Sequence, residues 1–328
     1  MMETMEEVEL CFPELFNVSC KKPKHPHSDA ALIYVLMSFT SVIAATLNLL
    51  VIISISHFKK LHTPTNLLLL SLAFSDFFVG ILMSFQIVIT NDCWVLGDIM
   101  CIAFSVLDFT TTSASVGTMV LISIDRYVAI CYPLRYSTKI TVRTVTVCIC
   151  LCWICSLLYN SLLMYDNLKH PDRYALCIGE CVTAITYIAG IADIVLTFFA
   201  PVTVIIVLYL RVFVVAVSQA RAIKSHIMPV THSGTVSAKK SELKAARTLG
   251  VVIVVFLTCL CPYFISSLVD VNSLFTVSSV PLQNWLFYFN SCLNPIIYAF
   301  CYPWYRKSIK LIVTFKIIQS DSCDTNIL

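Results

Sequence analysis

Seven long apolar stretches constrain the fold of this chain more than any other feature of its sequence. Each is about 20 residues or longer, which is enough for a helix to cross the hydrocarbon core of a membrane. None shows the alternation of polar and apolar residues that marks the strands of a membrane β-barrel. We therefore predict an all-α membrane protein, a seven-transmembrane helix bundle with its two termini on opposite sides. The stretches lie near residues 31–57, 65–90, 99–124, 144–165, 184–210, 248–271 and 281–301.

The composition agrees with a chain that is embedded in a membrane. Hydrophobic residues make up 58% of the 328 positions and charged residues only 12%. Soluble domains normally carry about 25% charged residues. The mean hydropathy of +0.85 also favours a membrane protein over a soluble one.

The distribution of basic residues predicts the orientation. Of the 22 Lys and Arg residues, all but Lys21, Lys22, Lys24, Lys169 and Arg173 would lie on one side of the membrane. Basic residues gather on the cytoplasmic side of membrane proteins. We therefore expect a plasma-membrane protein with an extracellular amino terminus. The first helix alone favours the reverse, because three lysines precede it and two follow it.

This orientation divides the chain into four parts. We expect an extracellular arm (1–29), the transmembrane bundle (30–301), a short amphipathic cytoplasmic helix (302–317) and a cytoplasmic tail (318–328). The arm begins with acidic residues and has no apolar stretch of the kind found in a cleaved signal peptide. Asn17 begins the only Asn-X-Ser/Thr sequon, and its place in the arm is compatible with glycosylation.

Six of the sixteen cysteines would lie outside the cell or at the outer ends of helices. An even number of cysteines in an oxidising compartment predicts a disulfide framework, although six cysteines allow fifteen pairings. The other ten lie mostly in apolar helices, where a free thiol packs as a small hydrophobic group. Neither set has the spacing and setting of a zinc site, so we expect no metal. The six are Cys11, Cys20, Cys93, Cys101, Cys177 and Cys181.

Two aspartates inside the apolar stretches are the most informative polar residues. A carboxylate within a membrane segment costs several kcal/mol unless it meets water, a partner or a ligand. Asp108 and Asp193 each precede an arginine, Arg126 and Arg211, by 18 residues. At 1.5 Å per residue each aspartate lies roughly 27 Å from its arginine, just beneath the outer surface of a core about 30 Å thick. The pair predicts a pocket, open to the outside, for a ligand with two positive charges.

Each aspartate also has a purely structural interpretation. Asp108 could be a carboxylate that stabilises the bundle by a hydrogen bond to the seventh helix. Asp193 could be a surface carboxylate near the outer end of the fifth helix. The residues that precede Asp193 do not determine which face of the helix it occupies.

Helical periodicity supports a cavity near Asp108. Thr112, Ser115 and Met119 follow Asp108 at spacings of three or four residues and share one face of the third helix. An ammonium group held by a carboxylate and surrounded by aromatic rings gains both charge pairing and cation–π attraction. The aromatic candidates for the pocket wall are Phe109, Phe198, Tyr263, Phe264, Trp285 and Tyr288.

Polar residues and prolines recur inside the apolar stretches in a fixed order. Taken together they resemble the rhodopsin-like class of G-protein-coupled receptors, over roughly residues 30–317. The residues are Asn48, Asp76, Asp125-Arg126-Tyr127, Trp153, Pro201, Pro262 and Asn294-Pro295-Ile296-Ile297-Tyr298. The segment from Asn290 to Tyr298, followed by Tyr302, Trp304 and Tyr305, is similar to the trace amine-associated receptors. That family usually has phenylalanine where this chain has Tyr305.

The family resemblance implies a function and partners. It implies an olfactory receptor for amines, located in sensory cilia, that raises cAMP through a stimulatory G protein of the olfactory type. In the family the residue that matches Asp108 is the amine anchor. For the disulfides it implies Cys101–Cys181, with Cys177 pairing with Cys11 and Cys20 pairing with Cys93.

The resemblance also implies an activation mechanism on the cytoplasmic side. Arg126, in the Asp125-Arg126-Tyr127 motif, would form an inactive-state ion pair with Glu242. Asp76 and Asn294 would form a polar centre that binds an allosteric sodium ion, the only cofactor implied. Leu260 replaces the tryptophan that the class usually has below its ligand, so Phe256 would carry that packing change together with Pro201 and Val116. The remaining implied residues are Leu134 at the G protein, Tyr209 and Tyr298 as switch tyrosines, and Pro295.

Charge pairing selects the ligand class. A monoamine would leave Asp193 as an unpaired buried charge, whereas short aliphatic diamines of the cadaverine or putrescine type pair both carboxylates. The alternatives are a receptor for a single aromatic or aliphatic monoamine and, more remotely, a small-amine transporter. A transporter is disfavoured because the sequence shows no internal repeat. No nucleophile–base constellation or phosphate-binding glycine loop favours an enzyme.

Overall fold

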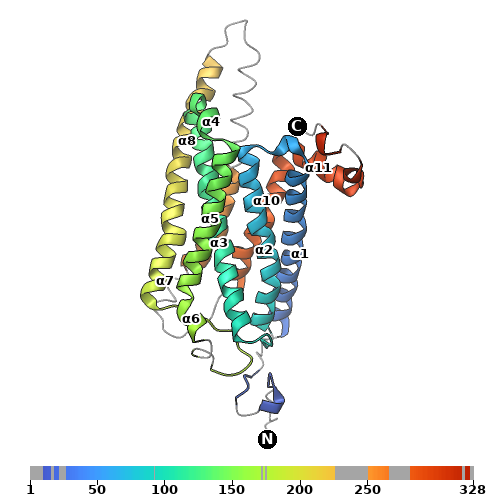
Figure 1. Cartoon of the computed structure of the whole chain (residues 1–328), viewed down its shortest axis with the longest axis vertical. Helices are drawn as coiled ribbons and strands as arrows, with labels where there is room; N and C mark the ends of the chain where they lie inside the picture. Colours follow the sequence, from blue (N-terminus) through green and yellow to red (C-terminus); the bar gives the residue numbers. More distant parts are fainter. Residues whose placement is uncertain are drawn as a thin grey trace.

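The computed structural model describes residues 10–15, 18–21, 27–91, 93–170, 173, 176–225, 250–265, 281–319 and 322–325. Within these ranges the regular secondary structure is helical, and strand-like pairing is limited to two isolated bridges. The long helices run side by side along one axis (Figure 1). The short helix η1 (Pro13–Leu15) lies at one end of the bundle and α11 (Pro303–Val313) at the other. We call these the η1 end and the α11 end.

The helices follow the order of the predicted apolar stretches. The long helices are α1 (His27–His57), α2 (Pro64–Asn91), α3 (Asp98–Cys131), α5 (Val142–Leu163), α7 (Tyr187–Ile194) continued by the π-helix η4 (Val195–Phe199) and α8 (Ala200–Ser225), the helix Gly250–Ile265, and α10 (Pro281–Cys301). The shorter elements are η2 (Lys59–Leu61), α4 (Pro133–Lys139), α6 (Tyr165–Lys169), η5 (Lys316–Ile318) and η6 (Ser322–Asp324).

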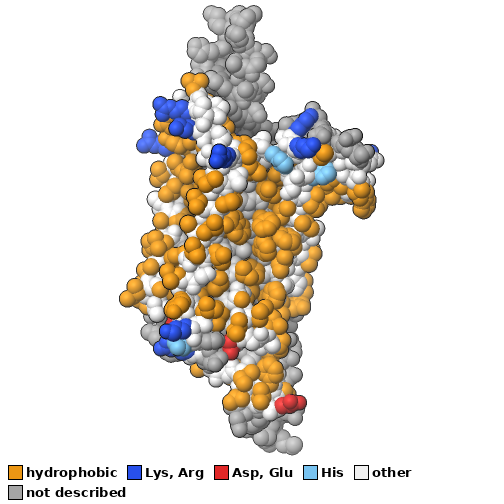
Figure 2. Space-filling model, viewed as in Figure 1, with side chains coloured by type: hydrophobic (Ala, Val, Ile, Leu, Met, Phe, Trp, Pro, Cys, Tyr) orange, Lys and Arg blue, Asp and Glu red, His pale blue; other side chains and the backbone are white. Residues whose placement is uncertain are grey.

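These helices have the length and polarity of membrane spans. In the described ranges α1, α2, α3, α5 and the run from α7 to α8 are long and apolar enough to cross a membrane. The helix Gly250–Ile265 is a shorter apolar helix. Figure 2 shows hydrophobic side chains over the middle of the bundle and Lys and Arg side chains at its ends. The predicted class, an all-α membrane protein, is therefore confirmed.

Local sequence signals explain where several helices begin. Proline occupies the first position of α2, α4, α10 and α11. A proline there leaves no intrahelical hydrogen bond unmade, because the first N–H groups of a helix have no partner within it. Thr141 caps α5, and its side-chain oxygen accepts a hydrogen bond from the backbone N–H of Thr144 at 3.2 Å.

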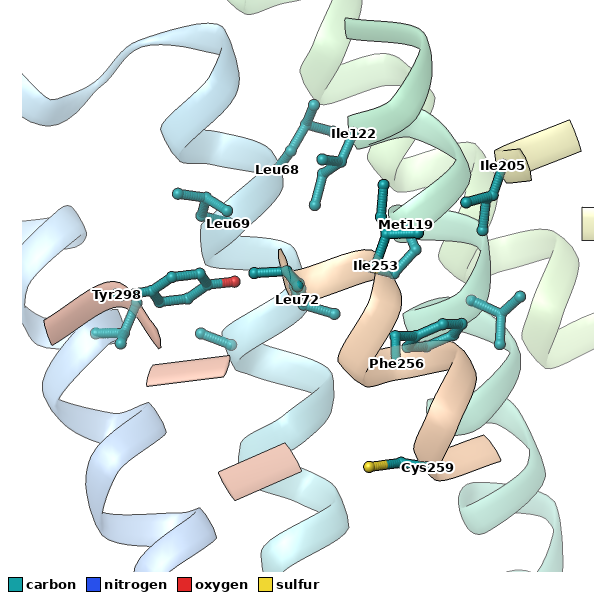
Figure 3. Packing of buried hydrophobic residues seen from close by; sticks show 14 of the residues in the cluster. Leu68, Leu69, Leu72, Met119, Ile122, Ile205, Ile253, Phe256, Cys259 and Tyr298 are labelled. Carbon is teal, nitrogen blue, oxygen red and sulfur yellow. The ribbon is translucent and has the colours of Figure 1, made fainter. Parts of the chain in front are cut away.

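The largest buried apolar cluster joins helices that are distant in the sequence. It packs Leu68, Leu69 and Leu72 of α2 against Met119 and Ile122 of α3. Ile253 and Phe256 of the helix Gly250–Ile265 and Tyr298 of α10 complete the packing that Figure 3 shows. The fully buried rings of Phe256 and Tyr298 are among the largest side chains in this cluster. The cluster fixes the positions of the helices that carry the site.

Two element boundaries differ from the sequence prediction. The fifth apolar stretch was expected to end near residue 210, but α8 continues to Ser225. The amphipathic helix was expected over 302–317, but α11 ends at Val313, and η5 follows after Phe315 adopts a left-handed backbone conformation with φ of 55°. A left-handed residue cannot continue a right-handed helix, which explains the early end.

At the η1 end three disulfides join the arm to the loops. Cys101, near the start of α3, pairs with Cys181 as the resemblance implied. The other two bonds correct the implied pairing, because Cys11 pairs with Cys93 and Cys20 pairs with Cys177.

Backbone hydrogen bonds explain the corrected pairing. The arm folds back on itself at an antiparallel bridge between Leu10 and Lys21. Its returning segment then runs parallel to the chain after Cys177, where the N–H of Cys20 donates to the Ile178 carbonyl at 2.9 Å. This places Cys20 beside Cys177. Cys11 lies against Gly179, whose carbonyl accepts the N–H of Trp94, so Cys11 lies next to Cys93.

Candidate functional site

The two aspartates line one cavity of about 550 Å³ near the η1 end. Asp108 lies on α3, and Asp193 lies at the end of α7. Six further residues were predicted at this pocket, and five of them line the cavity. Phe109, Thr112, Tyr263, Phe264 and Tyr288 line the cavity, whereas Trp285 does not.

Asp108 has one carboxylate oxygen with a partner and one without. The Tyr288 hydroxyl of α10 donates to its Oδ2 at 3.4 Å, a long hydrogen bond. Its Oδ1 is buried and has no hydrogen-bond partner among the described residues. Because leaving a buried charged oxygen unpaired is costly, this atom calls for a donor from a ligand or a solvent molecule. The bond to Tyr288 is the structural role that Asp108 was also expected to have, and Oδ1 remains available beyond it.

Asp193 is half-buried and is held from a neighbouring helix. The Tyr159 hydroxyl of α5 donates to its Oδ1 at 3.1 Å. The Thr197 hydroxyl donates to its backbone carbonyl at 2.8 Å, across the start of the π-helix η4. Asp193 lines the same cavity as Asp108. Single π turns inside helices occur frequently at functional sites.

Aromatic rings form the wall of the cavity on the side of α10 and the helix Gly250–Ile265. The centroids of Tyr263 and Phe287 are 4.6 Å apart, and those of Phe287 and Tyr288 are 5.2 Å apart in an edge-on arrangement. Phe198, also expected at the pocket, is buried beside it and stacks on Phe264 at 4.1 Å. Rings at this spacing support one another and present both faces and edges to a ligand.

Trp285 was expected at the pocket wall, but it faces α1 instead. Its indole N–H donates to the Thr40 hydroxyl of α1 at 3.0 Å, and its ring stacks on Phe289 at 4.8 Å. Asn284 takes its place at the cavity. Successive helix residues are rotated by about 100°, so the residue after Asn284 points well away from the cavity.

The stripe predicted below Asp108 leaves the cavity after Thr112. Ser115 lines a separate space of about 20 Å³ with Phe256 and Leu260. Met119 is fully buried in the apolar cluster. The periodicity grouped these residues on one face of α3, but of the three that follow Asp108 only Thr112 lines its cavity.

Several cavity residues were not predicted from the sequence. Ser113 and Asn160 line the cavity and are joined by a hydrogen bond of 3.2 Å between α3 and α5. Thr183 belongs to the segment after Cys181 and contacts Ser105 on α3 at 3.4 Å. Three adjacent polar residues at 159–161, close to the outer end of a predicted apolar stretch, were the available signal for the α5 wall.

A polar cluster at the α11 end contains the predicted Asp125-Arg126-Tyr127 motif. Asp125 accepts hydrogen bonds from Arg126 Nε at 2.9 Å, from Thr65 at 3.0 Å and from Tyr136 at 2.9 Å. Burial and the neighbouring Asp125 raise the pKa of the Tyr136 phenol, so this hydroxyl stays a donor. Glu242, the predicted partner of Arg126, lies outside the described residues, so that ion pair stays a prediction.

Four other residues that were predicted to act in activation lie on α3, α4 and α8. The Tyr127 hydroxyl donates to that of Tyr132 at 3.5 Å, and Leu134 on α4 is 93% exposed. Tyr209 reaches from α8 to Gly250, where an added Cβ would lie 1.8 Å from its hydroxyl oxygen. Pro201 lies in the first turn of α8, directly after the π-helix.

A second polar cluster lies in the centre of the bundle. Asp76 is buried and accepts hydrogen bonds from Ser291 at 2.9 Å and from Asn294 at 2.8 Å. Asn294 Oδ1 has no partner among the described residues. Pro295 lies inside α10 immediately after Asn294, and the Tyr298 hydroxyl is buried without a described partner.

Comparisons with known proteins agree with this architecture. Residues 47–298 match the family model described as 7 transmembrane receptor (rhodopsin family). The chain is 37% identical to trace amine-associated receptor 13c of Danio rerio over 328 residues, 97% of this chain and 96% of that protein. It is 38% identical to trace amine-associated receptor 6 of Homo sapiens over 337 residues, 98% of this chain and 96% of that protein. It is 39% identical to trace amine-associated receptor 9 of Rattus norvegicus over 336 residues, 98% of each.

Proposed function

We infer that this chain, which belongs to the rhodopsin family of seven-transmembrane receptors and within it to the trace amine-associated receptors, senses short aliphatic diamines. Membership of the family makes the chain a multi-pass receptor of the plasma membrane and not an enzyme. It also implies a small-molecule ligand and a G protein as partners.

One observation carries the diamine proposal. Asp108 and Asp193 line the same cavity, and each is held by one tyrosine hydroxyl through one carboxylate oxygen. Each carboxylate therefore has a second oxygen for a ligand. A monoamine would pair with one of these charges and leave the other unpaired, at a cost that is large in a cavity of low polarity.

The size and wall of the cavity suit an aliphatic chain between two ammonium groups. A chain of four or five methylenes spans roughly 6–8 Å between nitrogens from ordinary bond lengths. Tyr263, Phe264 and Phe287 offer apolar contact to the methylenes and cation–π attraction to an ammonium group. Cadaverine and putrescine are the simplest ligands of this kind.

The proposed orientation places the η1 end outside the cell. The three disulfides at that end support this orientation, because disulfides form in oxidising compartments. The cavity then opens outward, and the G protein binds the α11 end, where Arg126 and the exposed Leu134 lie. The proposal includes a stimulatory G protein that raises cAMP and a location in olfactory cilia. Asn17, the proposed glycosylation site, lies outside the described residues.

A sodium ion near Asp76 belongs to the same proposal. The buried Asn294 Oδ1 has no described partner, and it lies on the residue that donates to the Asp76 carboxylate. Two oxygen acceptors in one buried cluster fit a hard cation. The ion would bind at Asp76 and Asn294 and would neutralise the buried carboxylate.

Replacing Asp193 tests the diamine proposal directly. Asp193→Asn removes the charge and keeps the size of the side chain. We expect the potency of cadaverine in a cellular cAMP assay to fall about 10- to 100-fold, since a hydrogen bond to a charged group contributes about 1.5–3 kcal/mol. Pentylamine has the same chain with one nitrogen, and its potency should not fall. An unchanged cadaverine response, with equal receptor at the cell surface, would refute the two-carboxylate site.

The aromatic lining supports one alternative, a receptor for a single aromatic monoamine. In that case the amine pairs with Asp108, the ring packs among Tyr263, Phe264 and Phe287, and Asp193 accepts a hydrogen bond from a neutral group. Tyramine would then be more potent than any diamine in the same assay. Asp193→Asn would lower the tyramine response only slightly.

A further inference from the structure

Tyr159 makes a hydrogen bond to Asp193 but is not itself one of the residues that line the cavity. It lies on α5, and its hydroxyl donates to Asp193 Oδ1 at 3.1 Å. It is the only side-chain hydrogen-bond partner of the Asp193 carboxylate among the described residues. We propose that Tyr159 is a positioning residue that directs the second carboxylate into the cavity and thereby sets the preference for diamines over monoamines. This inference rests on the diamine function proposed above.

The local packing shows why Asp193 needs such a contact. The outer part of α7 has few protein neighbours, because Ile188 is 80% exposed to its surroundings and Ile194 is its one buried residue. Asp193 itself is only half-buried. Contacts with other protein side chains alone therefore do not fix the direction of the Asp193 side chain. A hydroxyl donated from α5 adds that constraint, because it fixes one carboxylate oxygen in space.

The two carboxylates differ in how much they depend on their tyrosines. Asp108 is also half-buried as a whole residue, but it lies within α3 rather than near its end, and its Oδ1 is fully buried. Packing alone therefore restricts the Asp108 side chain. Asp193 has no comparable enclosure, so its direction depends on Tyr159. The hydrogen bond from a phenol also stabilises the negative charge, because charge-assisted bonds are about twice as strong as neutral ones.

This difference predicts a selective effect on ligands. Tyr159→Phe removes the hydroxyl and keeps the ring, so α5 packs as before. Cadaverine needs Asp193 and should lose about tenfold in potency, which corresponds to about 1.4 kcal/mol. Pentylamine needs only Asp108 and should keep its potency. The ratio of the two potencies therefore isolates the positioning role from a general loss of stability.

A double-mutant cycle gives the decisive test. Potencies of cadaverine and pentylamine are measured for the wild-type receptor, Tyr159→Phe, Asp193→Asn and the double variant, with surface receptor quantified in each case. If Tyr159 acts through Asp193, the double variant matches Asp193→Asn, because neighbouring residues in one hydrogen bond are not additive. Tyr165→Phe, an exposed tyrosine on α6, is the control that should change neither potency.

The outcomes separate this inference from the proposed function. If Asp193→Asn lowers cadaverine potency and Tyr159→Phe does not, the diamine site stands and the role of Tyr159 is overturned. If Tyr159→Phe weakens both amines equally, its role is structural and the inference is again overturned. If Asp193→Asn leaves cadaverine unaffected, the proposed function itself fails, whatever Tyr159→Phe does.

Discussion

Asp108 Oδ1 is a buried carboxylate oxygen with no described hydrogen-bond donor. We therefore expect Asp108→Asn to weaken the binding of any amine. Breaking a buried ion pair costs about 3–5 kcal/mol, so cadaverine and pentylamine should both lose at least about 100-fold in potency. Asp166→Asn is the matched control, because Asp166 forms an exposed ion pair with Arg173 at 3.2 Å and such pairs contribute little. A retained pentylamine response in Asp108→Asn would contradict the anchor role.

Also at the residue scale, the level of a side chain along its helix could be predicted from the sequence, whereas the direction in which it points could not. The rise per residue placed Asp108 and Asp193 at one level, and both line the cavity. Trp285 was expected at the cavity and faces Thr40 instead, because one residue of helical rotation separates it from Asn284. Tyr159 was missed because its role depends on the distance between α5 and α7, which no local pattern encodes.

Among the elements, α1 and α2 approach each other closely at Gly80. A Cβ added there would lie 2.7 Å from the backbone nitrogen of Ala45, and the Ser41 hydroxyl donates to the Gly80 carbonyl at 2.6 Å. Gly80→Ala must therefore separate the two helices. We expect a loss of about 1–3 kcal/mol in stability, the usual cost of overpacking, measured as a lower melting temperature of the purified receptor.

Gly190→Ala is the matched control on α7. Nothing lies within 4 Å of a Cβ added at Gly190, so the change should be neutral or stabilising by about 0.5–1 kcal/mol. Equal melting temperatures for the Gly80 and Gly190 variants would show that α1 and α2 tolerate the added methyl group.

The existence of the helices followed from hydrophobicity, while their interruptions did not. The apolar stretches predicted the long helices because the membrane requires about 20 apolar residues for each span. The π-helix η4 was not predicted, since Val195–Phe199 is as apolar as its neighbours. The end of α11 depends on the left-handed conformation of Phe315, which phenylalanine adopts rarely and no motif announces.

For the molecule as a whole, two disulfides attach the arm to separate segments beside the cavity. Six cysteines allow fifteen pairings, and the choice depends on how the arm folds back between Leu10 and Lys21.

The structure predicts that Cys20→Ser leaves a free thiol at Cys177, whereas Cys11→Ser leaves one at Cys93. Labelling intact cells with a membrane-impermeant maleimide, followed by peptide mass mapping, identifies the freed residue. Labelled Cys93 in the Cys20→Ser variant would restore the pairing implied by the family resemblance. Labelling from outside also tests the orientation, because the η1 end must face the medium for the reagent to reach either thiol.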